Sequence, residues 1–123
     1  MTAPTQTALA EVALAFAKDC LGWKDARLPR QRCFGGGVLI TTRNPNKYLR
    51  PDILDDVMSV VEEWTKEHRY SASLHCFEGN AYTAIIRRED EVPGIVGRAT
   101  NRNHCHALLS ACVKAARKLR EAA

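Results

Sequence analysis

Two runs of alternating side chains meet at a glycine turn in residues 70–88, YSASLHCFEGNAYTAIIRR. Before the turn, Ala72, Leu74 and Cys76 fall on one side of the chain, and the residues between them fall on the other. After the turn at residues 78–80, the second run alternates in the same way. A period of two is typical of strands that bury one face. The stretch therefore predicts an antiparallel β-hairpin.

The segments that flank this hairpin predict further strands. A turn at Pro93-Gly94 precedes the short segment 95–99, which we expect to be the third strand of a meander. Upstream, three consecutive glycines at 35–37 precede the apolar run 38–41, which predicts a tight turn and a strand. Glycines can also cradle a phosphate, but that arrangement needs a helix directly after the loop, and none is expected here.

Three segments repeat apolar side chains at helical spacing. The first begins with Thr7 as its N-cap and ends at Gly22, where a left-handed glycine lets Trp23 fold back onto the last turn. The third begins near Asn101 or Asn103 and continues to about residue 119. The second follows Pro51, with Asp52 as its cap, and its core stripe is Ile53, Val57, Val60, Val61 and Trp64.

Together these elements have the order α-β-α-β-β-β-α. This order predicts an α+β fold in which a small antiparallel sheet of about four strands packs with three helices. The chain has 123 residues, a usual length for one domain, and no low-complexity linker divides it. We therefore expect a single domain over residues 1–123.

The composition is that of an ordinary globular protein, with 46% apolar and 26% charged residues. No stretch approaches the roughly 20 apolar residues that span a bilayer, and the first residues do not resemble a secretory signal. The five cysteines are odd in number, scattered and free of any C-x-x-C pair, as in proteins of a reducing compartment. We expect a cytoplasmic location, no membrane partner, and cysteines that act as small buried apolar residues.

The net charge of +4 is unevenly distributed along the chain, and one segment is basic. Eight lysines or arginines lie between residues 18 and 50, and aromatic residues are interleaved with them. Such a segment can contact phosphates and stack bases, and a solvated surface of uneven charge is the alternative. The candidate nucleic-acid-binding residues are Arg27, Arg30, Arg32, Arg43, Lys47 and Arg50.

The next segment is acidic. Six acids and a single lysine lie between residues 52 and 68, on the side of the second helix opposite its core stripe. Gathering this much like charge slightly destabilises a helix, which favours an interaction surface, although a plain solvated face remains the alternative. The candidate partner-binding residues are Asp55, Asp56, Glu62, Glu63 and Glu67.

The polar clusters do not define a catalytic or metal site. The side chains of His104-Cys105-His106 are candidate ligands of a metal ion, with His75 or Cys76 as a further ligand. Residues two apart on a helix point about 200° apart, however, so both histidines cannot bind one ion there. The thiols and imidazoles also lack the flanking signature of a catalytic cysteine. We predict no catalytic residue, no metal ligand and no cofactor.

Several short motifs occur along the chain in a recognisable order. LGWK at 21–24 follows an alanine-rich helix, Tyr48 precedes a helix that opens at Asp52-Ile53 and reaches VVEEW at 60–64, and CHALL at 105–109 lies in the last helix. This pattern resembles the phage ABA sandwich domain family of small phage and prophage proteins. The last helix departs from the Thr-x-Pro-like start that is usual in the family. The resemblance implies the fold and a phage setting, and it implies no enzymatic activity and no functional residues.

These features lead to the hypothesis of a non-enzymatic phage or prophage accessory protein that binds a host or viral protein. Inhibition of a host defence system, for example of a CRISPR effector complex, is implied by the phage setting alone. Two alternatives stay open. One is a nucleic-acid-binding module that uses the basic segment 24–50, and the other is a small enzyme or metalloprotein.

Overall fold

The order of the elements agrees with the predicted order except for one additional strand before the second helix. The computed structural model describes residues 3–28, 39–44, 46–77, 79, 81–90 and 94–122. Along these residues the elements are α1 (Ala3–Asp19), β1 (Ile40–Thr41), β2 (Tyr48–Leu49), α2 (Leu54–Glu67), β3 (Tyr70–Phe77), β4 (Ala81–Arg88), β5 (Ile95–Asn101) and α3 (His104–Ala122). The described chain thus has three helices and two small antiparallel sheets, and the predicted α+β class is confirmed.

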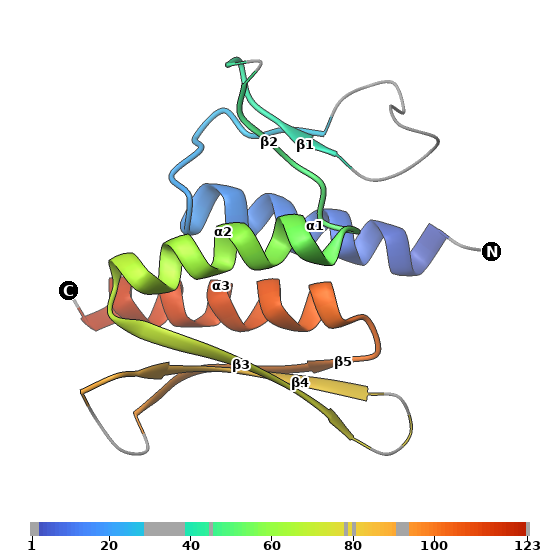
Figure 1. Cartoon of the computed structure of the whole chain (residues 1–123). Helices are drawn as coiled ribbons and strands as arrows, with labels where there is room; N and C mark the ends of the chain where they lie inside the picture. Colours follow the sequence, from blue (N-terminus) through green and yellow to red (C-terminus); the bar gives the residue numbers. More distant parts are fainter. Residues whose placement is uncertain are drawn as a thin grey trace.

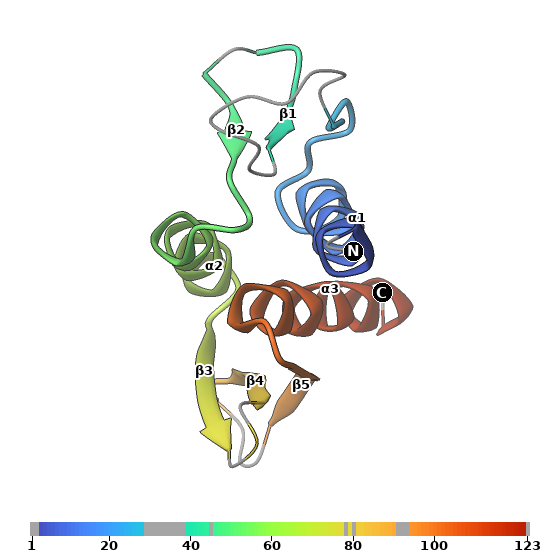
Figure 2. The same cartoon turned by 90° about the vertical axis from the view of Figure 1, so that its right-hand side faces the viewer.

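Helix α3 is the central layer of the molecule (Figures 1 and 2). The sheet β3-β4-β5 packs on one side of α3 and α1 on the other, while α2 contacts both α3 and β3. The ribbon β1-β2 lies beyond α1 and α2, at the end of the molecule far from β3-β4-β5. Buried apolar side chains from all three helices and both sheets belong to one core cluster.

The predicted hairpin and meander are confirmed. Strand β3 pairs with β4 over eight residue pairs, among them Ala72 with Ile86 and Leu74 with Ala84. Strand β4 then pairs with β5, which continues to residue 101, beyond its expected end. The register shifts next to Ile86, and this leaves Val96 as the extra residue of a β-bulge in β5.

The strand expected at 38–41 does not join the meander. Its described part, β1, pairs with β2 in a separate sheet, in which Ile40 is opposite Leu49 and Thr41 is opposite Tyr48. Residues 35–38 lie outside the described residues. Helices lie between β1 and the meander, so β1 pairs with segments on its own side of them. One is β2, and the other is Arg27, whose backbone N–H and C=O exchange hydrogen bonds with those of Thr41 at 2.9 Å. The expected sheet of about four strands is therefore divided into sheets of three and two strands, and the sequence had not indicated β2.

Helix α1 ends as predicted and begins earlier than predicted. Gly22 has a left-handed φ of 70°, and the N–H of Trp23 donates to the carbonyl of Ala17 at 2.9 Å. The helix begins before Thr7, the expected cap. Pro4 is compatible with this early start, because the first turn of a helix needs no N–H there.

Helix α2 begins without the side-chain cap that we expected from Asp52. Its N-cap position is Ile53, whose side chain makes no capping hydrogen bond. Pro51 and Asp52 instead form a turn, closed by a hydrogen bond from the Ile53 N–H to the Arg50 carbonyl at 3.1 Å. This turn places Asp52 outside the helix.

The predicted core stripe of α2 is buried except at two positions, and that of α3 is buried except at one. In α2, Val57, Val61 and Trp64 are buried and Val60 is half-buried, but Ile53 is 37% exposed because it precedes the helix. In α3, the stripe is buried until Leu119, which is 38% exposed in the last turns. Asn103 decides where α3 starts, since its side-chain oxygen accepts the His106 N–H at 3.1 Å.

Candidate functional site

The acidic candidates lie along the exposed side of α2. Asp56 differs from the rest, since its carboxylate binds the Arg50 guanidinium at 2.7 Å. Both side chains of this pair are partly exposed, and such pairs stabilise a fold by about 0.2–1 kcal/mol. The other four are exposed and make no ion pair within the described part of the chain: Asp55, Glu62, Glu63 and Glu67.

Helical spacing divides these four carboxylates into two rows. Asp55 and Glu62 are two turns apart and form the outer row. Glu63 and Glu67 are about one turn apart and form the inner row, which faces the segment after α1. Side chains four residues apart on a helix are neighbours, with Cβ atoms roughly 5–6 Å apart. One ligand group can therefore contact both carboxylates of the inner row.

The inner row borders a cleft between α2 and the segment that follows α1, which we call the α2 cleft. Its volume is about 340 Å³. Leu21 and Trp23 line it from the end of α1, and Val60 and Trp64 line it from α2. The α2 cleft therefore combines an apolar wall with two carboxylates.

Local structure holds the two tryptophans in place. Trp23 is half-buried, because the Gly22 turn returns the chain onto α1. The Trp64 side chain is 3% exposed, and its ring lies 4.9 Å from the ring of His68 and 5.7 Å from that of Tyr70. The wall of the cleft is thus formed before any partner binds.

Two of the basic candidates lie beside an acid. Arg27 and Arg43 are exposed, and the backbone N–H of Arg43 donates to the Asp25 carboxylate at 2.7 Å. This hydrogen bond, and to a smaller degree the charges of Arg43 and Arg27, lower the pKa of Asp25. A negative charge therefore persists next to both arginines.

The remaining basic candidates are separated from that pair. Lys47 lines the α2 cleft, and Arg50 is occupied by its ion pair with Asp56. Arg30 and Arg32 lie outside the described residues. The described members of the set thus belong to three different environments and do not form one continuous row of cations.

The cluster His104-Cys105-His106 is divided by the start of α3. Cys105 is 1% exposed in the core, and the His104 ring meets the Tyr82 ring edge-on at 5.4 Å. His106 has a buried Nδ1 without a hydrogen-bond partner, and burial lowers its pKa. Among the residues that the structure describes, no three His, Cys, Asp or Glu side chains are grouped so that they could hold a metal ion.

Of the four described cysteines, two are buried as expected, one is half-buried and one is exposed. Cys105 and Cys112 lie in the core, and burial raises the pKa of Cys105 to about 11. Cys20 is half-buried with its Sγ 3.6 Å from the Cys112 carbonyl, and burial raises its pKa to about 12. Cys76 is exposed, against expectation, because it lies near the turn end of the hairpin. Cys33 lies outside the described residues.

Sequence reasoning did not identify the α2 cleft. Its walls come from residues 20–23, from Lys47 and from residues 60–67, which are far apart along the chain. The one available signal was that each tryptophan directly adjoins a charged residue, as in Trp23-Lys24 and Glu63-Trp64. Helical periodicity identified Trp64 as a core residue, but it did not indicate that Trp64 also lines a cleft.

Comparisons with known proteins give no relative for this chain. No family model matches the sequence, and neither the curated proteins nor the solved structures contain a significant match. The resemblance to the phage ABA sandwich domain family therefore stays a prediction. In the described part of the chain, no helix has the length and apolar character that crossing a bilayer requires.

Proposed function

We propose that this chain is a non-enzymatic protein-binding module whose α2 cleft holds a basic side chain of a partner protein. One observation carries the proposal: the two carboxylates of the inner row lie beside an apolar wall that includes Trp23 and Trp64. Lysine and arginine have the matching parts, since each has an apolar stem and a cationic end. The cleft is thus complementary to such a side chain in both charge and polarity.

Arginine fits this arrangement better than lysine. Its planar guanidinium has five donors and can bind two carboxylates, and it also stacks on aromatic rings. Its stem would cover Leu21 and Val60, and the partial exclusion of water would strengthen the ion pairs relative to fully exposed ones. The outer row, Asp55 and Glu62, adds long-range attraction that speeds association at low salt.

The biological setting of the proposal comes from the family resemblance. In that setting the chain is a phage or prophage accessory protein in the bacterial cytoplasm, and its partner is a host or phage protein. A host defence complex that handles nucleic acid, such as a CRISPR effector complex, has basic grooves that an acidic helix could occupy. Occupying such a groove would inhibit the complex.

The test compares two variants of equal charge. Glu63→Lys with Glu67→Lys reverses the inner row, and Glu11→Lys with Glu121→Lys makes the same change on exposed sites outside α2. Proteins captured from a bacterial lysate are identified and purified, and their affinities for both variants are measured. The inner-row variant should bind at least about tenfold more weakly than the control variant, because repulsion replaces two ion pairs.

A second measurement addresses Lys47, which lines the same cleft as the two carboxylates. Lys47→Ala should strengthen binding of the partner severalfold, because it removes a cation from the edge of the cleft. The melting temperatures of all variants should stay close to that of the parent protein, since the core stripe of α2 is unchanged. A captured partner that binds the inner-row variant at full affinity would exclude the α2 cleft as its site.

A further inference from the structure

The two edge strands of the larger sheet differ in how their outer backbone groups are protected. The strand order is β3-β4-β5, so within the described chain β3 and β5 each have one side that no strand covers. Such an edge presents N–H and C=O groups that can pair with a strand of another chain. Proteins commonly prevent this pairing with charged side chains, prolines or bulges.

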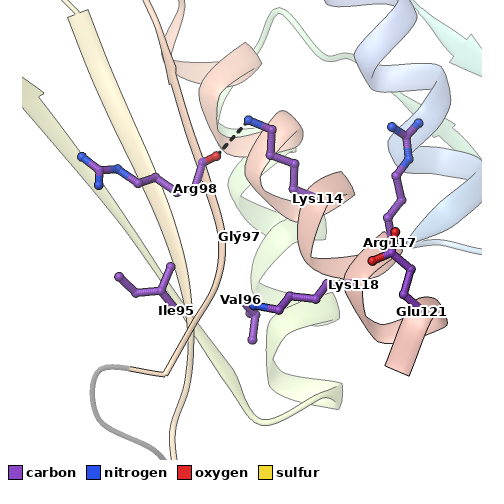
Figure 3. Close-up of a pocket in the computed structure, with 8 residues that line it drawn as sticks. All are labelled: Ile95, Val96, Gly97, Arg98, Lys114, Arg117, Lys118 and Glu121. Atoms are coloured by element: carbon purple, nitrogen blue, oxygen red, sulfur yellow. Dashed lines mark hydrogen bonds between the residues drawn. The ribbon is translucent and has the colours of Figure 1, made fainter. Parts of the chain in front are cut away.

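Strand β5 has two of these protections (Figure 3). The Nζ of Lys114 in α3 donates to the backbone carbonyl of Arg98 at 3.1 Å. Lys118, on the next turn of α3, lines the same groove of about 430 Å³ as Val96, the bulged residue. The lysines oppose an incoming strand on the helix side, and the bulge disturbs its register. The edge of β5 is therefore blocked.

Strand β3 has neither protection. Its sequence, YSASLHCF, contains no lysine, arginine, aspartate, glutamate or proline. It pairs with β4 along its whole length, from Tyr70 to Phe77, without a shift of register. Eight regular residues form an edge of about 26 Å, long enough for a full additional strand.

We infer that the outer edge of β3 is the docking surface for an extended, positively charged segment of a partner protein, which adds to the sheet as a further strand. The main chain of the segment would pair with β3, as in other strand-addition complexes. We expect the segment to be positively charged because the neighbouring helix, α2, is acidic. Figure 2 shows α2 directly above β3 on the same side of the molecule, and the two elements are in contact.

The net charge on that flank of α2 is negative, since its two carboxylates outnumber Lys66, which lies about one turn after Glu62. The inner row faces the α2 cleft, so helical periodicity places the outer row, Asp55 and Glu62, on the flank away from α1. A strand added to β3 would run alongside this flank. Lysine or arginine side chains on its helix-facing side would then approach these carboxylates, which make no ion pair within the described chain.

A second copy of this chain fits the same edge less well. Pairing of β3 with β3 of another copy about a twofold axis would also bring the two acidic α2 helices towards each other, where like charges repel. A basic segment would instead be attracted to the acidic α2 helix. This docking surface consists of β3 and the outer row, and neither the inner row nor the α2 cleft is part of it.

The experiment uses the full chain and a fluorescein-labelled octapeptide of alternating lysine and valine. Binding is followed by fluorescence anisotropy, and hydrogen exchange is followed by mass spectrometry. We expect exchange to slow at least about tenfold in residues 70–77 and to stay unchanged in 95–101, because only paired edge amides gain hydrogen bonds. The same peptide with alternate amides N-methylated should bind at least about tenfold more weakly, since it loses several donors.

Two variants separate this site from the α2 cleft. Asp55→Lys with Glu62→Lys should weaken peptide binding at least about fivefold, whereas Glu63→Lys with Glu67→Lys should change it less than about twofold. Unchanged exchange in 70–77 at saturating peptide, or equal binding of the methylated peptide, would overturn the inference. So would slower exchange in 70–77 that depends only on the concentration of the chain itself, because the occupant would then be a second copy.

Discussion

Gly97 in β5 and Ala111 in α3 are in direct backbone contact: a Cβ added to Gly97 would overlap the Ala111 carbonyl oxygen. The same Cβ would lie 3.1 Å from the Cβ of Ala115. The sheet can approach α3 this closely only because position 97 has no side chain. This contact sets the spacing between the sheet and the helical layer.

Replacing Gly97 by alanine should therefore destabilise the protein by at least about 2 kcal/mol, because the two backbones must move apart. The control is Gly79→Ala, where a Cβ meets nothing within 4 Å although φ is +90°. That change should cost only about 1 kcal/mol, the strain of a left-handed alanine. Urea denaturation measures both free energies of unfolding. Equal losses of unfolding free energy for the two substitutions would mean that the contact between β5 and α3 is not tight.

Replacing Arg69 by glycine should stabilise the protein. Arg69 joins α2 to β3 with a φ of 56°, the only positive φ of a non-glycine residue in the described chain. Glycine would remove backbone strain of about 1–2 kcal/mol from the folded state. It would also raise the entropy of the unfolded chain, which lowers the stability by roughly 0.4–1 kcal/mol. We expect Arg69→Gly to stabilise by up to about 1 kcal/mol in thermal denaturation. Arg87→Gly, at an exposed position within β4, is the control and should destabilise by about 0.5–1 kcal/mol.

His106 should make stability depend on pH. Burial lowers the pKa of its ring below the usual value of 6.5, so the folded state binds the proton more weakly than the unfolded state. Stability contributed by the neutral ring is then present above about pH 6.5 and is lost as the pH falls through that value, until it levels off below the folded pKa. Melting temperatures measured between pH 7.5 and 5 report this loss.

His106→Leu supplies the comparison for that measurement. The variant has no titrating ring at this position and no buried nitrogen without a partner, so its stability should fall less on acidification. Parallel melting curves for the two proteins across the whole range would refute a role for His106.

The cysteines should differ widely in reactivity. Burial raises the pKa of Cys20 to about 12 and that of Cys105 to about 11, so at pH 8 almost none of either thiol is ionised. Cys76 is exposed and should be alkylated before Cys20 and Cys105. In the folded protein, iodoacetamide labelling mapped by mass spectrometry should show that Cys76 is modified at least about tenfold faster than Cys20 and Cys105. Denaturant should abolish the difference, and equal rates without denaturant would contradict the burial of Cys20 and Cys105.

Nucleic-acid binding should be weak and moderately dependent on salt. Arg50 is occupied by Asp56, which leaves at most five of the six basic candidates for phosphates. Each contact with duplex DNA contributes about −0.9 to the slope of log affinity against log salt, so the slope should be no steeper than about −4.5. Electrophoretic titrations at several salt concentrations measure it. Sub-micromolar, sequence-selective binding at physiological salt would favour the nucleic-acid alternative over protein binding.

The elements that periodicity predicts are those whose stability depends on nearby residues. Alternation in residues 70–88 predicted the hairpin, because each strand buries one face against its neighbour. The stripe in α2 predicted its buried side, and glycine predicted the left-handed end of α1 at Gly22. The acidic surface could also be predicted, since the charges on α2 follow from the same period as its core. All of these features involve residues a few positions apart.

The features that only the tertiary structure decided join residues far apart in the chain. Periodicity could not show that β1 pairs with a two-residue strand instead of the meander, because both partners are too short to have a pattern. It placed Arg50 and Asp56 in opposing candidate sets, although they bind each other. The α2 cleft, the blocked edge of β5 and the contact at Gly97 likewise arise where separate layers meet. Packing between layers depends on shape and distance in three dimensions, and no local pattern of side chains specifies either.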